Sequence, residues 1–253
     1  MSVIGILGAR GGVGASLLAA NLACALAQRG RSLLLDLHPL TGADDLYLGL
    51  GNEQTWVDLL PLVAELSDNH LELVCQRHAS GLRVLAAPSH PLTQLEPMLD
   101  LVNALEPFTD YLVVDLPRAN PTIWKLPATP EAPQFLVTCL DPPSLRSARH
   151  TLAIVPPTWK SKTRLVISQW ATPHPLSPEE ASQALGIDLA AVLPFDPEAI
   201  GQQVHFGLPA LLQEASTYGK AVRRFANQIA GSRDPSAEQA PLGHGIRGRD
   251  VET

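Results

Sequence analysis

Charged and aromatic side chains are scarce in this sequence. Charged residues make up 17% of its 253 residues and aromatic residues 5%, whereas soluble domains average about 25% charged residues. Hydrophobic residues account for 45%, the ordinary share for a globular protein. The composition therefore excludes a disordered or fibrous chain, and the length fits a single large α/β domain.

Basic residues are also in deficit. Lysine and arginine number 18 against 25 aspartates and glutamates, which gives a formal net charge of -7. An acidic chain has no long-range attraction for a phosphate backbone. We therefore expect no nucleic-acid partner, although a local basic patch stays compatible with this balance.

Cysteines are few and long hydrophobic runs are missing. Cys24, Cys75 and Cys139 are isolated, without C-x-x-C spacing, so they predict buried thiols in a reducing compartment rather than disulfides or a zinc site. No apolar run reaches about 20 residues without a charge or a proline, and residues 1–7 lack the basic leader of a signal peptide. We expect a cytoplasmic protein that reaches a membrane or cell pole only peripherally, through partners.

Short β-branched or leucine-rich segments alternate with segments of helical periodicity. The predicted strands are Val3–Leu7, Ser32–Asp36, Leu82–Ala87, Tyr111–Asp115, Gln134–Cys139, Arg164–Ser168 and Ala190–Leu193. The predicted helices are Ala15–Arg29, Trp56–Leu66, Leu92–Leu105, Ser144–Val155, Pro178–Leu185 and Thr217–Ala230. This alternation predicts a doubly wound α/β fold, with a mainly parallel sheet of about seven strands and helices on both faces.

The composition changes towards the end of the sequence. Residues 232–253 are mainly glycine, proline, serine and charged residues, with too little apolar surface to offset the entropy of ordering. We predict one folded domain over residues 1–231 and a disordered tail over residues 232–253. Within the folded part, prolines concentrate in residues 117–133 and 173–178, where they predict loops.

The last predicted helix and two tryptophans bear on external contacts. The apolar stripe of that helix consists of Tyr218, Val222, Phe225 and Ile229. Such an amphipathic helix is typical of packing on a sheet, and binding to a membrane surface is the alternative. Trp124 and Trp159 lie in polar or proline-rich surroundings, which predicts side chains that face a partner.

A glycine-rich loop follows the first predicted strand and leads directly into the first helix. Residues 8–16 read Gly-Ala-Arg-Gly-Gly-Val-Gly-Ala-Ser, and such loops present backbone N–H groups to an anion. A working P-loop ends in Gly-Lys-Ser/Thr, with the lysine on the phosphates, but Ala15 stands at the lysine position. The loop predicts phosphate binding, and a tight turn without a ligand is the alternative.

Two aspartates end apolar strands elsewhere in the sequence. Asp36 closes the second predicted strand, and Asp115 closes the run 111–115 in the manner of a Walker B segment, whose carboxylate lies near magnesium. With the loop hydroxyl they predict a metal site made of Ser16, Asp36 and Asp115. The alternative is a pair of carboxylates solvated at strand ends, but their coincidence with the glycine-rich loop favours the metal site.

Five segments together resemble a known family. They are residues 8–23, 77–88, 113–118, 141–149 and 193–201. The sequence resembles the ParA/MinD class of deviant-Walker-A P-loop proteins, and more narrowly the TadZ/CpaE branch of pilus-assembly proteins, over residues 3–230. The resemblance implies a P-loop NTPase-like fold, ATP and Mg²⁺ as cofactors, a homodimer, and partners in a pilus or secretion machinery.

The resemblance also implies which residues contact the nucleotide. They are Arg10, Gly11, Gly12, Val13, Gly14, Ala15, Ser16, Ser168 and Pro194. Arg10 corresponds to the class-defining lysine that reaches the partner's phosphates across the dimer, and it keeps the positive charge; a solvated loop arginine is the alternative. Ala15 corresponds to the second lysine, and losing such a charge-assisted contact costs roughly 1.5–3 kcal/mol. Ser168-Gln169 replaces an Asn-Arg pair that contacts adenine.

His38 stands where the resemblance places the aspartate that positions the attacking water. An imidazole can accept a proton, but an ordinary loop histidine is the plainer interpretation, and we assign no catalytic residue. Because Ala15 and His38 both depart from the pattern, we predict little ATP turnover.

Two functions stay open for the chain. The first is a non-hydrolysing, homodimeric scaffold that localises a Flp/Tad-type pilus or secretion apparatus. The second is an active ParA/MinD-type ATPase in positioning or DNA segregation. The missing lysine and the acidic composition favour the scaffold.

Overall fold

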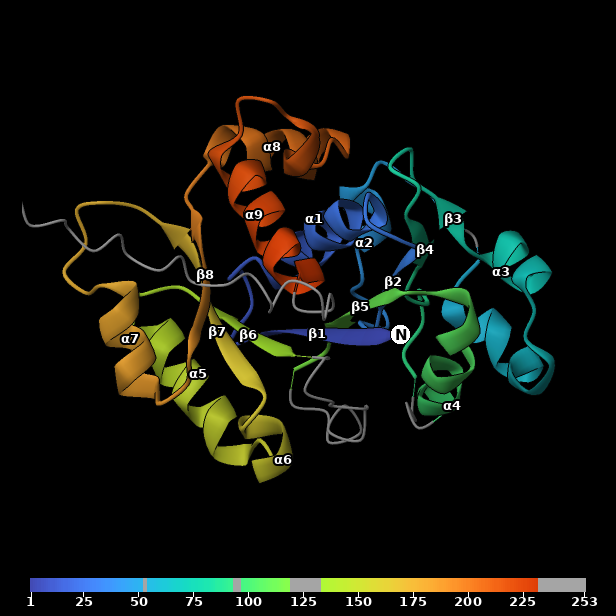
Figure 1. Ribbon diagram of the computed structural model, residues 1–253, viewed down its shortest axis with the longest axis horizontal. Helices are drawn as coiled ribbons and strands as arrows, with labels where there is room; N and C mark the ends of the chain where they lie inside the picture. The colour runs from blue at the N-terminus through green and yellow to red at the C-terminus, as the bar shows by residue number, and fades with distance from the viewer. Residues whose placement is uncertain (52–53, 93–96, 119–132, 232–253) are drawn as a thin grey trace, which may run out of the picture.

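The protein is described by a computed structural model over residues 1–51, 54–92, 97–118 and 133–231. Within these residues, eight strands form one sheet in the order β3-β4-β2-β5-β1-β6-β7-β8 (Figure 1). The strands are β1 (Ser2–Gly8), β2 (Ser32–Asp36), β3 (Gln76–Arg77), β4 (Arg83–Leu85), β5 (Tyr111–Leu116), β6 (Gln134–Thr138), β7 (Thr163–Trp170) and β8 (Leu189–Pro194). Neighbouring strands pair in parallel except β3 and β4.

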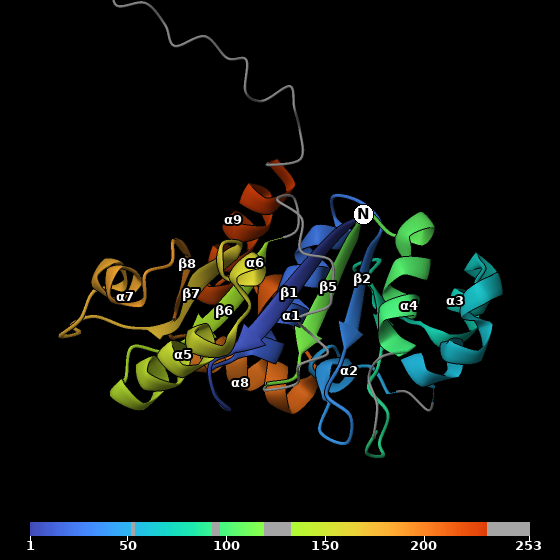
Figure 2. The same cartoon turned by 90° about the horizontal axis from the view of Figure 1, so that it is seen from below.

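Helices cover both faces of the sheet. The α-helices are α1 (Ala15–Ala27), α2 (Asp44–Tyr47), α3 (Asp68–Val74), α4 (Pro97–Ala104), α5 (Pro142–Ile154), α6 (Pro157–Lys160), α7 (Pro178–Leu185), α8 (Pro197–Phe206) and α9 (Thr217–Gly231). The 3₁₀ helices are η1 (Trp56–Glu65), η2 (Glu106–Phe108) and η4 (Ala210–Leu212). Figures 1 and 2 show α1, α8 and α9 on one face and α4, α5 and α6 on the other. The doubly wound fold predicted from the sequence is confirmed.

Two hydrophobic cores sit on either side of the sheet because successive strand residues point to opposite faces. In β1, Ile4 and Ile6 join the core under α1 and α9. Val3 and Leu7 join the core under α4 and α5. Every residue of β1 is buried, which explains why the central strands read as continuous apolar runs.

Several elements differ from the prediction. The segment expected as an α-helix over residues 56–66 is the 3₁₀ helix η1, which contains Pro61; proline has no N–H to donate to a regular α-helical ladder. Strand β3 and helices α2, α3 and α6 were not predicted, because they are too short to show a periodicity. Helix α8 was also missed, although its start is marked by Asp196 as N-cap and Pro197 at the first position.

The predicted partner-facing role of Trp159 is wrong. The residue is only 3% exposed and belongs to the hydrophobic core that also contains Ala148 and Leu152 of α5. Trp124 and the predicted tail over residues 232–253 lie outside the described residues, as does most of the proline-rich segment 117–133. The predicted burial of the cysteines is confirmed, since Cys24, Cys75 and Cys139 are all buried.

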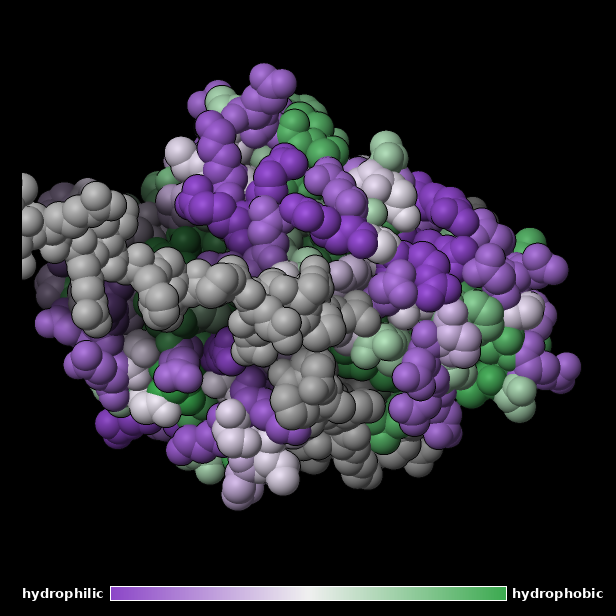
Figure 3. Space-filling view, viewed as in Figure 1, coloured by the Kyte–Doolittle hydropathy of each residue, from purple (hydrophilic) through white to green (hydrophobic). Residues whose placement is uncertain are grey.

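Helix α9 packs on the sheet, as its apolar stripe predicts. Phe225 lies in the core, with its ring 4.8 Å from that of Phe135 on β6. The outer face of α9 is hydrophilic (Figure 3). Among the helices of the described residues, none has both the length and the apolar character needed to cross a membrane.

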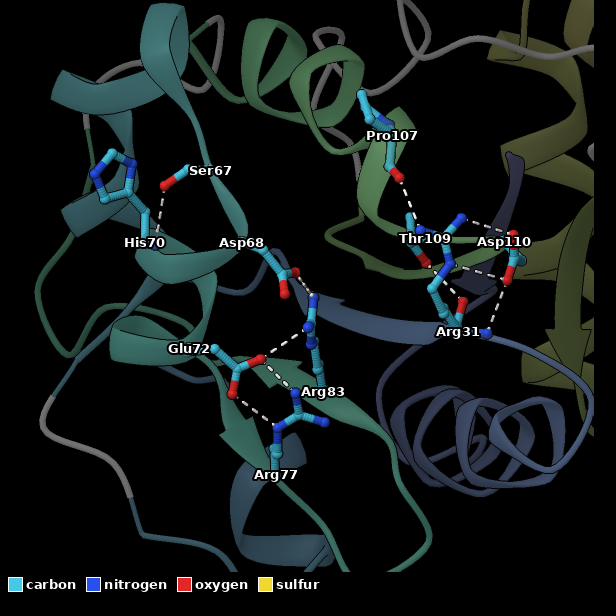
Figure 4. A network of polar contacts seen from close by, with 10 residues as sticks. All are labelled: Arg31, Ser67, Asp68, His70, Glu72, Arg77, Arg83, Pro107, Thr109 and Asp110. Carbon is cyan, nitrogen blue, oxygen red and sulfur yellow. Dashed lines mark hydrogen bonds and ion pairs between the residues drawn. The ribbon is translucent and has the colours of Figure 1, made fainter.

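Ion pairs join residues on the surface near the start of several strands (Figure 4). Arg83, the first residue of β4, pairs with Asp68 and Glu72 of α3 at 2.8 Å each. Arg31 pairs with Asp110 at 3.0 Å, just before β2 and β5 begin. The exposed Arg31–Asp110 pair contributes little to stability, and all of these pairs lie at the amino ends of the strands, away from the glycine-rich loop.

Candidate functional site

The predicted loop and both predicted aspartates meet at the carboxyl edge of the sheet. Strand β5 lies between β1 and β2, and the register pairs Asp115 with Ile6 on one side and with Asp36 on the other. Because parallel strands end at the same edge, the loop after β1 lies above these carboxylates. Figure 2 shows β1, β5 and β2 running side by side to this edge.

The loop conformation explains its glycines. Gly12 and Gly14 have φ of 80° and 84°, in the left-handed region where residues other than glycine are strained. Gly14 is also the N-cap of α1, which begins at Ala15. The first N–H groups of a helix lack intrahelical partners, so the loop directs unsatisfied donors to the point where an anion would bind.

Arg10 points from the loop towards α5 of the same chain. Its Nε donates to Oγ of Ser144 at 2.7 Å, and its Nη2 lies 3.5 Å from Oδ2 of Asp141. Asp141 is the N-cap of α5 and also accepts from Ser144. The Arg10 side chain is 42% exposed. It is therefore held at one side of the loop by a neighbouring acid, and its role across a dimer stays a prediction.

His38 lies between the two aspartates. Its Nδ1 is 3.2 Å from Oδ1 of Asp36 and 3.2 Å from Oδ2 of Asp115. Its backbone N–H also donates to Oδ1 of Asp36 at 2.9 Å. Both carboxylates are almost fully buried, whereas the imidazole is 26% exposed. The histidine is thus part of the site and not an ordinary loop residue.

The protonation of this cluster follows from burial and neighbouring charge. Burial lowers the pKa of His38, but hydrogen bonds and charge from Asp115 and Asp36 outweigh it and raise the pKa to about 10. Burial raises the pKa of Asp115, against the lowering effects of His38 and Ser16. The ring therefore carries the positive charge that two adjacent buried carboxylates require.

A third carboxylate, which the sequence analysis missed, lies beside this pair. Asp44 is fully buried, and neither of its side-chain oxygens has a hydrogen-bond partner in the described structure. Its backbone N–H donates to Oδ2 of Asp36 at 3.3 Å. Burial and the charges of Asp115 and Asp36 raise the pKa of Asp44 well above its usual range. No periodicity or motif marks Asp44, because only the turn into α2 brings it to Asp36.

The oxygen atoms of this cluster suit Mg²⁺, whereas the His38 nitrogen does not. The predicted ligands Ser16, Asp36 and Asp115 converge, since Asp36 and Asp115 are in register and Ser16 is close enough to Asp115 to lower its pKa. Hydroxyl and carboxylate oxygens are the ligands that Mg²⁺ prefers. The donor atoms of Asp36, His38 and Asp115 also lie within 4.8 Å of one another. A divalent cation at the carboxylates would have to compete with the His38 ring.

Ser168 and Gln169 contact the glycine-rich loop at the end of β7. Oγ of Ser168 lies 3.3 Å from the position that a Cβ on Gly14 would take. Nε2 of Gln169 donates to the carbonyl oxygen of Gly12 at 2.8 Å. Gln169 itself has φ of 56°, so its backbone bends to bring the side chain onto the loop. The pair therefore supports the loop conformation, a role that the resemblance did not imply for Gln169.

Two adjoining cavities open at this edge. The first, of about 300 Å³, is lined by the loop together with His38, Tyr47, Arg118 and Gln169. The second, of about 340 Å³, is lined by Ser168, by Pro194 at the end of β8 and by residues of α8 that include Ile200 and Val204. Gly14, Leu17 and Gln169 border both cavities. One cavity thus offers backbone donors and cations to phosphates, and the next offers an apolar surface to a base.

This arrangement defines a P-loop NTPase-like fold: a glycine-rich loop between the central strand and α1, with strand-end aspartates next to it. No protein-family model matches the sequence. The septum site-determining protein MinD of Thermotoga maritima is 25% identical, over 92% of this chain and 90% of its own length. MinD of Bacillus subtilis is 26% identical, over 91% of this chain and 89% of its own length.

Solved structures agree with these sequence matches. A ParA family ATPase from Chlorobium tepidum has a TM-score of 0.77 at 23% identity, covering 89% of this chain and 98% of its own. Aquifex aeolicus MinD, in its complex with MinC, has a TM-score of 0.74 at 22% identity, covering 96% of this chain and 99% of its own. The fold is that of ParA and MinD proteins. Sequence and fold together support the ParA/MinD superfamily for this chain.

Proposed function

We propose that the chain is a nucleotide-binding member of the ParA/MinD superfamily with little or no ATPase activity. In this proposal it serves as a homodimeric scaffold that localises a Flp/Tad-type pilus or secretion apparatus. The observation that carries the low activity is the joint change at two positions. Ala15 stands in place of the phosphate lysine, and His38 is held by Asp36 and Asp115.

Nucleotide binding is supported by the two adjoining cavities. The left-handed glycines of the loop and the start of α1 would hold the phosphates through backbone N–H groups. The apolar cavity beside Ser168 and Pro194 would hold the base. Mg²⁺, when bound, would be held by Ser16, Asp36 and Asp115 and would neutralise phosphate charge. The MinD of Pyrococcus horikoshii, whose structure is a complex with Mg-ADP, has a TM-score of 0.66 to this chain.

Slow hydrolysis follows from what the site must supply at the transition state. Charge developing on the γ-phosphate needs cations, and a single arginine finger is worth about 10³–10⁵ in rate. An alanine at position 15 supplies no charge. The Nδ1 atom of His38 already contacts two carboxylates, so the ring is not free to position a water in the manner of an aspartate.

Binding and turnover must be measured separately to test this proposal. Binding of ATP and ADP with Mg²⁺ is measured by calorimetry, and phosphate release by a continuous assay, for the wild type and for Ala15→Lys combined with His38→Asp. We expect nucleotide binding with phosphate release near background for the wild type, and a higher rate for the double variant. Arg224→Ala, an exposed change on α9, is the matched control. Wild-type turnover like that of an ordinary P-loop ATPase would overturn the proposal.

An active, MinD-type positioning ATPase is the second candidate. It is favoured by the 25% identity to Thermotoga MinD over 92% of this chain. The pilus role is favoured by the five segments that resemble TadZ/CpaE proteins. Removing the protein from its cell distinguishes the two: the scaffold predicts loss or misplacement of surface pili, whereas the alternative predicts misplaced division septa with normal pili.

A further inference from the structure

We propose that Arg118 is the phosphate-binding cation of this site and takes over the role that Ala15 cannot fill. The sequence resemblance assigns no role to this residue. The inference rests on the proposed nucleotide binding. It adds that the Arg118 side chain, which follows β5 next to the loop, would contact the phosphates. Its ligand class is a nucleoside di- or triphosphate.

The sheet register brings Arg118 to the loop. β1 and β5 are neighbours, and Leu7 at the end of β1 pairs with Leu116 at the end of β5. Arg118 follows two residues later, where the chain after β1 has entered the glycine-rich loop. Its Nη2 atom lies 3.8 Å from the position that a Cβ on Gly11 would take. Arg118 also lines the cavity of about 300 Å³ that the loop encloses with His38 and Gln169.

Two arginines border this cavity, and their electrostatic situations differ. Arg10 is turned towards α5, where Asp141 and Ser144 contact its guanidinium. Within the described part of the chain, Arg118 makes no ion pair. Among the described residues, no acid therefore pairs with its charge, in contrast to the charge of Arg10. A permanently charged, forked donor is well suited to phosphate oxygens.

The buried acids below the loop make such a cation necessary. Asp36 and Asp115 share the single imidazole of His38, and Asp44 is buried next to them. An anionic phosphate entering this region meets negative charge that the His38 ring offsets only in part. The loop's backbone donors carry no full charge, so a side chain at the mouth must supply it, and Arg118 stands there.

The test compares ligands that differ in their phosphates. Dissociation constants for ATP, ADP and adenosine are measured by calorimetry on the full chain for wild type, Arg118→Ala, Arg118→Lys and the control Arg224→Ala. We expect Arg118→Ala to bind ATP about 10- to 100-fold more weakly, the range of one charge-assisted contact. Adenosine binding should not change, Arg118→Lys should fall between, and the control should match wild type. Arg118 is exposed, so thermal unfolding should be unaffected.

A second variant tests whether Arg118 takes the place of the lysine that is missing at position 15. Ala15→Lys introduced into Arg118→Ala should recover most of the lost ATP affinity if the two positions serve the same charge. If wild type binds ATP and Arg118→Ala binds it equally well, the role of Arg118 is wrong while the proposed function stands. If wild type binds no nucleotide, the proposed function fails and this role fails with it.

Discussion

The Nδ1 atom of His38 lies 3.2 Å from Oδ2 of Asp115, and His38 lines the cavity that the glycine-rich loop borders. The same nitrogen is 3.2 Å from Asp36, so one ring joins the ends of two neighbouring strands. In a P-loop protein the carboxylates at this place serve a metal ion. Here a side chain of the protein already offsets part of their charge.

Replacing His38 by alanine should destabilise the protein and make its stability sensitive to Mg²⁺. Removing one partner of a buried charge group costs about 3 kcal/mol or more, and we expect somewhat less here because the imidazole is 26% exposed. Thermal unfolding with and without millimolar MgCl₂ measures both effects. His150→Ala, an exposed histidine on α5, is the control. An unchanged melting temperature for His38→Ala would contradict the structural role of this ring.

Shortening Gln169 to asparagine should weaken nucleotide binding more than it affects stability. Its Nε2 holds the Gly12 carbonyl at 2.8 Å, and asparagine tolerates the left-handed backbone at this position but is one methylene shorter. The loop would then lose its support without new backbone strain. ATP calorimetry and urea unfolding on the same variant separate the two effects. Equal ATP affinity for variant and wild type would show that the loop keeps its shape unaided.

Asp196 should make part of the stability dependent on pH. Its carboxylate accepts from the N–H of Ala199 at 3.3 Å, from Ser216 at 2.8 Å and from the N–H of Tyr218 at 3.1 Å. Burial raises the pKa of Asp196, but these donors outweigh it and the pKa is lowered overall. A lowered folded-state pKa means that the contribution is present above the unfolded pKa of about 3.9 and is lost as the pH falls through the folded value.

Asp196→Ala should therefore lower the free energy of unfolding by about 1–2 kcal/mol at pH 7. The difference from wild type should shrink as the pH falls below about 3.9. Urea unfolding at several pH values measures it. Asp188→Ala, an exposed aspartate before β8, should change the free energy by less than about 0.5 kcal/mol throughout. A pH-independent difference for Asp196→Ala would refute the assignment.

Dimerisation should depend on nucleotide and on Arg10. Two anionic nucleotides between protomers need cations from both sides, and ligand binding at the interface strengthens association by linkage. We expect Mg-ATP to increase association of the wild type and Arg10→Ala to reduce that increase. Sedimentation with and without Mg-ATP measures both. Because Asp141 holds Arg10 in the free chain, Asp141→Asn should increase the ATP-linked association, and a wild-type monomer under all conditions at micromolar concentration would exclude the dimer.

Local sequence patterns were sufficient to predict the main strands and helices of the fold. Strands such as Ser32–Asp36 and helices such as Pro178–Leu185 appear in the structure where they were predicted. Periodicity identifies them because each contacts the core along one regular stripe or face. The loop Gly8–Ser16 was also recognisable, since its left-handed positions require glycine and thus leave a mark in the sequence.

The side-chain contacts of the site could not be predicted from the sequence. Arg10 contacts Asp141, 131 residues away, and Gln169 contacts Gly12, 157 residues away. Nothing local in the sequence encodes such pairs, because they depend on strand order and on the direction in which each chain leaves the sheet. The sequence placed His38 on the loop after β2, but it did not show that the ring lies between two carboxylates.

The sequence by itself determined the class of fold, the glycine-rich loop and the absence of a lysine at position 15, because these depend on residue type and short spacing. Only the tertiary structure decided where the remaining charges lie. The parallel register of β1, β2 and β5 brings His38 to Asp115 and Arg118 to Gly11. Charge interactions fall off with distance and depend on burial, so their balance is set only when distant segments are packed together.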